Sequence, residues 1–164
     1  MATEGVVFLI RQSVARFYWE HDRNCATTTL CVLSELFDIQ LSEQTLDSAV
    51  AMHGAGKYGA QCGLVEGAIM FIGVFGRHSK IEDACTIDAC REFAQNFENR
   101  FGSLLCRVLR SEGFRSDNPP HLCERITCDA IEFAARHIAK FLKEDGKEFI
   151  ASTLTANNYP RSGA

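Results

Sequence analysis

The sequence has little proline, no excess of positive charge and no long apolar run. Only 3 of the 164 residues are proline, and alternation of polar and apolar residues is scarce, which favours helices over strands. The chain carries 17 Lys and Arg against 21 Asp and Glu, so no basic surplus is available for phosphate backbones and we predict no nucleic-acid partner. No segment approaches the ~20 apolar residues that cross a bilayer, so we predict no membrane insertion.

The beginning of the chain also lacks the marks of a secretory leader. It has no basic segment, and the apolar stretch at residues 6–10 is too short for a signal-peptide core, so we expect a cytoplasmic protein. Hydrophobic residues at 46% and charged residues at 23% are ordinary values for a globular domain. We predict one domain over residues 1–151, followed by a mobile polar tail over residues 152–164.

Apolar residues recur at helical spacing along most of the chain. They predict an all-α single-domain bundle of six or seven helices, with a glycine-rich loop at residues 54–59 before the fourth helix. The predicted N-caps are Asp22, Ser42, Ser79 and Ser103. The expected helices cover residues 4–19, 23–37, 43–52, 60–75, 80–101, 104–109 and 121–143.

The eight cysteines divide into two sets, and no Cys-x-x-Cys pair occurs among them. Four are expected within helices, where they would fill core space: Cys31, Cys85, Cys90 and Cys128. The other four are each expected in or beside the first turn of a different helix: Cys25, Cys62, Cys106 and Cys123. A helix start carries positive potential, so we predict lowered thiol pKa values there and a shared redox or metal site.

The same cysteines carry a family resemblance. The segment Asn24-Cys25-Ala26, the glycine loop leading into residues 62–68, residues 102–107 and finally Cys123 together resemble the C_GCAxxG_C_C family, which is described as redox-active. The resemblance runs from about residue 6 to residue 142 and extends to the cysteine module of split-Soret cytochromes. It implies a role for the four cysteines and for Gly63 in binding a cofactor. Leu64 stands where the family has alanine.

Several chemistries fit four cysteines. Four thiolates are a standard ligand set for an iron–sulfur cluster, which is our first hypothesis, with electron transfer or sensing as its use. Thiol–disulfide exchange between cysteine pairs is the second. A structural zinc site or a non-catalytic interaction protein are further alternatives. The spacing, with 36, 43 and 16 residues between successive cysteines, requires folding to bring them together.

Other motifs carry less weight. Residues 54–59 match G-x-G-x-x-G, but no strand precedes them, so we expect this backbone to pack against the cysteine site instead of binding a dinucleotide. His53 and His121 adjoin the site in sequence, and His137 is expected to be a satisfied core residue. No catalytic constellation beyond the thiols is present, so an electron-transfer protein with an unidentified redox partner is favoured over a substrate-converting enzyme. The glycine-rich fourth helix could also pack against a second copy in a homodimer.

Overall fold

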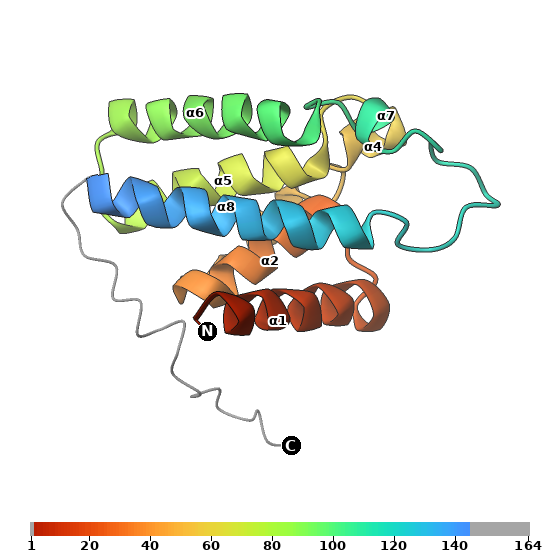
Figure 1. Ribbon diagram of the computed structural model, residues 1–164, viewed down its shortest axis with the longest axis horizontal. Coiled ribbons are helices and arrows are strands. Elements are labelled where there is room, and N and C mark those ends of the chain that lie inside the picture. Colours follow the sequence, from red (N-terminus) through yellow and green to blue (C-terminus); the bar gives the residue numbers. More distant parts are fainter. Residues whose placement is uncertain (1, 145–164) are drawn as a thin grey trace, which may run out of the picture.

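The computed structural model describes residues 2–144, with side chains for residues 4–141. This part of the chain is all-α and forms one bundle, as predicted (Figure 1). Five of its eight α-helices have seven or more residues, and the eight-helix total includes two single turns of four residues. In order, the elements are α1 (Ala2–Ala15), the π-helix η1 (Arg16–Glu20), α2 (Cys25–Phe37), α3 (Glu43–Ser48), α4 (Gly54–Lys57), α5 (Gly63–His78), α6 (Asp83–Phe101), α7 (Cys106–Leu109) and α8 (Glu124–Glu144).

The long helices pack in a fixed set of pairs. Helix α5 lies against both α2 and α6, and α8 contacts α1, α2, α5 and α6. Because α5 and α8 start at the same end of the bundle as α4 and α7, the loops between them gather at that end (Figure 1). The largest side chains with almost no exposure fill the space between these helices: Ile10, Leu30, Leu33, Phe71, Ile72, Phe93, Phe97, Ile131 and Ile138.

Glycines let α2 and α5 touch backbone to backbone. A Cβ atom at Gly67 would lie 2.5 Å from the carbonyl oxygen of Ala26, and a Cβ atom at Gly76 would lie 2.4 Å from Oγ1 of Thr86 in α6. These contacts lie within one chain and account for Gly67 and Gly76, whereas Gly73 in the same helix has no such contact. The homodimer therefore stays a prediction, without support from Gly67 and Gly76.

One predicted N-cap is confirmed and three are wrong. Ser42 caps α3 by accepting a hydrogen bond from the amide of Thr45. The cap of α2 is Asn24, not Asp22. The Asn24 carboxamide accepts from the Thr27 amide and also donates to the carbonyls of residues 49 and 50, so it joins the helix start to the next loop.

The other two wrong caps lie on either side of α6. Ser79 ends α5 and does not begin α6, whose N-cap is Glu82 and has no side-chain cap bond. The left-handed backbone of Lys80 (φ 57°) separates the two helices. Ser103 accepts a hydrogen bond from the amide of Leu105, and α7 starts only at Cys106. At Ser103 a short side chain to backbone bond thus forms a turn, where the pattern predicted a helix start.

The cysteines expected to fill the core are not all inside it. Cys31 is buried, and Cys90 and Cys128 are partly buried against the core. Cys85 is exposed, which corrects the prediction. Since α6 begins at Asp83, Cys85 lies in its first turn, ahead of the stretch where Ala89 and Phe93 pack inward.

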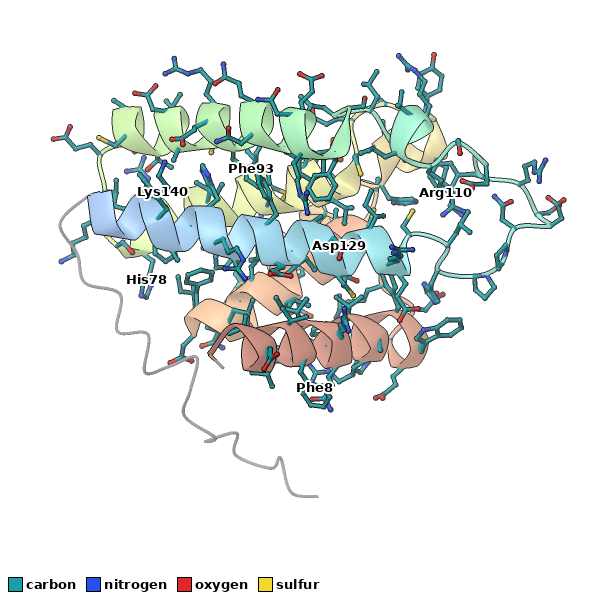
Figure 2. All side chains as sticks on the ribbon, in the orientation of Figure 1. Phe8, His78, Phe93, Arg110, Asp129 and Lys140 are labelled. Carbon is teal, nitrogen blue, oxygen red and sulfur yellow. The ribbon has the colours of Figure 1, made fainter. Side chains whose placement is uncertain are left out.

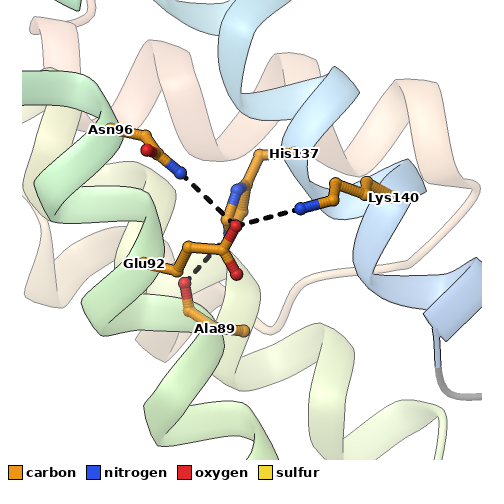
Figure 3. Close-up of polar contacts among 5 residues, drawn as sticks. All are labelled: Ala89, Glu92, Asn96, His137 and Lys140. Carbon is orange, nitrogen blue, oxygen red and sulfur yellow. Dashed lines mark hydrogen bonds and ion pairs between the residues drawn. The ribbon is translucent and has the colours of Figure 1, made fainter. Parts of the chain in front are cut away.

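The buried histidine of α8 is confirmed as a satisfied core residue. The Nε2 atom of His137 lies 2.9 Å from the carbonyl oxygen of Ala89, which joins α8 to α6 (Figure 3). Beside it, Lys140 donates to Glu92 across the same two helices, and Asn96 donates to that carboxylate from one turn further along α6.

No helix among residues 2–144 is long and apolar enough to span a membrane. The predicted tail at residues 152–164, and with it the end of the predicted domain, lie outside the described residues.

Candidate functional site: a four-cysteine cavity

Each of the four singled-out cysteines lies at the start of a different helix, as predicted. Cys25 is the first residue of α2 and Cys106 the first of α7. Cys62 is the N-cap residue of α5, and Cys123 immediately precedes Glu124, the first residue of α8. All four side chains line the same cavity, which has a volume of about 940 Å³. Folding therefore brings together residues that are up to 98 positions apart (123 − 25).

A short backbone pairing holds two of these cysteines side by side. The amide of Cys62 donates to the carbonyl of Leu104 at 2.8 Å, and the amide of Cys106 donates to the carbonyl of Ala60 at 2.7 Å. Gln61 and Leu105 form an isolated antiparallel bridge between these bonds. The chain segments leading into α5 and α7 are thereby fixed against each other, because each supplies both a donor and an acceptor.

Two glycines keep space free for the sulfur atoms. A Cβ atom at Gly54, whose φ is +70°, would lie 2.9 Å from Sγ of Cys106. A Cβ atom at Gly63 would lie 2.6 Å from Sγ of Cys25 and 2.4 Å from the carbonyl oxygen of Met52. The expectation that the glycine-rich backbone packs against the cysteine site is confirmed. The role of Gly63 in binding a cofactor stays a prediction, since its observed task is to make room for Cys25.

Burial raises the pKa of three of the thiols, contrary to the prediction that helix starts lower them. Burial raises the pKa of Cys62 to about 12, although the backbone amide of Leu64 acts in the opposite direction. Burial is the main cause that raises the pKa of Cys25 well above its usual range. The negative charges that Cys62, Cys123 and Cys106 would carry raise it further. Burial, followed by the negative charge that Cys123 would carry, raises the pKa of Cys106 as well. Desolvation of a thiolate here outweighs the favourable amides.

An arginine that the sequence analysis missed contacts one of the cysteines. The guanidinium of Arg110 donates to Sγ of Cys123 at 3.5 Å, donates to the carbonyl of Gly113 and lies over the ring of Phe114. Its charge also lowers the pKa of Cys106 against the larger effect of burial. Figure 2 shows Arg110 at the end of the bundle where α4 and α7 lie. Helical spacing gave no signal for this contact, because Arg110 lies beyond the end of α7 and its bond is to Cys123, which follows a loop.

A buried tyrosine closes the cavity from the first helical segment. Tyr18 lies in η1, and its hydroxyl forms a 2.7 Å hydrogen bond with the hydroxyl of Thr127. Its ring stacks on His121 with 4.7 Å between the centroids. Burial, followed by the charge of Cys25, raises its pKa well above the usual range. The sequence signal was present, because Tyr18 follows Ile10 and Val14 at steps of four residues, and all three are buried.

Both histidines that adjoin the site in sequence also line the cavity. His121 lies 3.7 Å from a carboxylate oxygen of Asp22, and burial lowers the pKa of His53. Within residues 2–144, no group of three or more His, Cys, Asp or Glu side chains is arranged to hold a metal ion. All eight cysteines are free thiols.

The fold and the site together define an all-α protein with a cysteine-lined cavity at one end of its bundle. A family model described as "Putative redox-active protein (C_GCAxxG_C_C)" matches residues 23–137, and the chain belongs to this family. In the comparisons with curated proteins and with solved structures, nothing matches this chain.

Proposed function

We propose that Cys25, Cys62, Cys106 and Cys123 together bind an iron–sulfur cluster that serves electron transfer or sensing. The observation that carries the proposal is that four helix starts contribute one thiol each to the same cavity. Four cysteine thiolates are the usual ligands of [2Fe–2S] and [4Fe–4S] clusters. When bound, such a cluster supplies one-electron chemistry.

The thiols are not arranged around a single metal ion, but the residues beside them leave room and supply donors for a larger group. Gly54 and Gly63 keep Cβ atoms away from two of the sulfurs, and the amide of Leu64 and the guanidinium of Arg110 act on two others, Cys62 and Cys123. Donors of this kind tune a cluster by stabilising negative charge on its sulfurs. After burial, which is the larger cause, the charges of the other three thiolates raise the pKa of Cys25, so four thiolates without a cation between them would repel one another.

The arrangement of the side chains weighs against a single zinc ion. Structural zinc sites are closed, with four sulfurs about 2.3 Å from the ion, whereas among the described residues no group of three or more His, Cys, Asp or Glu side chains could hold one metal ion. A cluster places its own iron and sulfide atoms between the thiolates, so its ligands stand farther apart than those of one tetrahedral ion.

Thiol–disulfide exchange is the second candidate. It is favoured by the free state of all eight cysteines and by the backbone pairing that holds the segments of Cys62 and Cys106 together. The raised pKa values weigh against it, because the thiolate is the reacting form and little of it is present near neutral pH.

Anaerobic purification, followed by reconstitution with iron and sulfide, tests the proposal. We expect stoichiometric iron and acid-labile sulfide with visible absorption, lost in Cys62→Ser and retained in Cys85→Ser. Cys85 is the matched control because it is exposed and does not line the cavity. Protein that stays free of iron after reconstitution, or that binds one zinc ion and no sulfide, would contradict the proposal. In the first case a redox-dependent change in the thiol count would favour exchange chemistry.

A further inference from the structure

The cavity next to the four thiols is strongly cationic, although the chain as a whole is acidic. The formal net charge is −4, yet the side chains lining the cavity include four Arg or Lys and a single carboxylate, Asp22. The Asp22 side chain is 99% exposed, so it contributes little negative charge to the interior. The four cations are Arg23, Lys57, Arg110 and Arg115. Concentrating cations in a hollow against the overall charge raises the local concentration of anions.

Two lining side chains also hold buried polar atoms that have no hydrogen-bond partner within the described residues. They are Nε of Arg23 and Nδ1 of His53. A buried polar atom without a partner costs about 1–3 kcal/mol, so such atoms ordinarily have one. Both residues line the same cationic cavity, so a molecule bound in it would be a partner for these atoms; Arg23 also acts on Cys31, and the Val50 backbone acts on His53.

The rest of the wall suits a small organic molecule. Aromatic rings of Tyr18 and Phe114 and aliphatic side chains such as Leu64 and Ile126 face the same space. Pockets for small molecules have volumes of about 300–1,000 Å³ and combine apolar walls with a few charged groups. At about 940 Å³, the cavity has room for a molecule of this size beside the cysteines.

We infer that this cavity is a binding site for a small anion that bears phosphate or carboxylate groups. Lys57 and Arg115 hold the charged groups at the outer part of the cavity, where both side chains are exposed. The apolar wall receives the body of the molecule. The inference deepens the proposed function, because it names the class of molecule that reaches the four thiols.

Calorimetric titration of the metal-free full chain at low salt tests the inference, with inorganic phosphate and citrate as probes and glycerol as the neutral comparison. We expect saturable binding of at least one anion, one per chain, and none of glycerol. In the double variant Lys57→Gln, Arg115→Gln the Kd should rise about tenfold, the loss expected when charge-assisted hydrogen bonds disappear. Binding of phosphate but not citrate assigns a phosphate-bearing ligand, and the reverse assigns a carboxylate.

The double variant Lys80→Gln, Arg91→Gln is the matched control and should change the Kd less than twofold. It removes the same charge outside the cavity, Lys80 has a positive φ as Lys57 does, and Arg91 pairs with a nearby aspartate as Arg115 does. Absence of saturable binding, or equal weakening in both double variants, would overturn the inference.

Cys62→Ser separates this inference from the proposed function. If both hold, the variant loses iron after reconstitution and still binds the anion. Iron binding without anion binding refutes only the inference, and anion binding by a chain that never takes up iron refutes only the cluster.

Discussion

Two regions of the bundle differ in their packing: one is filled by aromatic rings, and the other encloses a cavity. Between α6 and α8, Phe93, Phe97, Phe101 and Phe133 form a continuous aromatic cluster, in which neighbouring ring centroids lie 4.4–6.2 Å apart. At the end of the bundle where α2, α5, α7 and α8 begin, the helix starts enclose a cavity lined by thiols, cations and polar atoms that have no partner among the described residues.

The aromatic cluster stabilises the fold, whereas the cavity carries the groups that could act chemically. Aromatic rings packed in tilted or edge-on geometry stabilise the fold through buried area and ring contacts. A cavity with desolvated thiols and unpaired donors costs free energy, and proteins retain such features mainly at functional sites. The following predictions test this division, from the largest expected effect to the smallest.

Phe97→Ala should destabilise the fold most, by about 3–5 kcal/mol, because it removes a side chain with no exposure from the aromatic cluster. Urea unfolding followed by circular dichroism measures this change. Phe8→Ala is the control, since Phe8 is 60% exposed on α1, and it should change the free energy of unfolding by about 0.5 kcal/mol or less. Equal effects of the two substitutions would show that the aromatic cluster is not the main stabilising region.

Gly63→Ala should destabilise by about 1–3 kcal/mol and reduce the iron bound after reconstitution, because the new methyl group would collide with the Met52 carbonyl and the Cys25 sulfur. Gly73→Ala, in the same helix, has open space around its new methyl group and should stabilise by about 1 kcal/mol through helix propensity. Thermal unfolding and iron analysis of both variants check the pair. If Gly63→Ala behaves like Gly73→Ala, the close approach to Cys25 has no energetic consequence.

Arg110→Gln should lower the reduction potential of the proposed cluster by on the order of 50 mV, because losing a positive charge beside the Cys123 sulfur disfavours the added electron. A spectroscopic redox titration measures the potential. Arg91→Gln is the control, because the Arg91 side chain is exposed on α6 and does not line the cavity. A potential that moves equally in both variants would mean that only the net charge matters, and not the hydrogen bond to Cys123.

The smallest effect is expected at the Glu92–Lys140 pair between α6 and α8 (Figure 3). The hydrogen bond from Lys140 lowers the pKa of Glu92 below its unfolded value. The pair therefore stabilises the fold above the unfolded pKa, and this contribution is lost as pH falls through the folded pKa.

Glu92→Gln should thus lower stability by less than about 1 kcal/mol at pH 7, as for other exposed pairs, and match the wild type in acid. Thermal unfolding across pH measures it, with Glu98→Gln on the same helix as the control. If the stability difference between Glu92→Gln and the wild type persists unchanged below the folded pKa of Glu92, its cause is packing and not the charge of the pair.

Much of the fold was predictable because helical periodicity is local. The spacing of Ile10 and Val14, and of Ala89, Phe93 and Phe97, identifies faces that are buried in the structure. The wrong caps at Asp22, Ser79 and Ser103 are short polar residues two or three positions before the observed N-caps Asn24, Glu82 and Leu105. Short polar side chains can bond to backbone in turns as well as at helix starts, and the choice depends on what the neighbouring loop offers. Asn24 prevails over Asp22 because its amide group also reaches the loop at residues 49–50.

By itself, the sequence determined the all-α class and the helix-start position of the four cysteines, since each depends on residues close together in the chain. It also determined the family, which depends on the order and spacing of motifs along residues 23–137. Only the tertiary structure decided that these cysteines share one cavity, that Arg110 and Tyr18 belong to it, and that the pKa values of the Cys25, Cys62 and Cys106 thiols rise instead of falling. The physical reason is desolvation. The potential at a helix start is a local property, whereas burial depends on every helix that packs around the site.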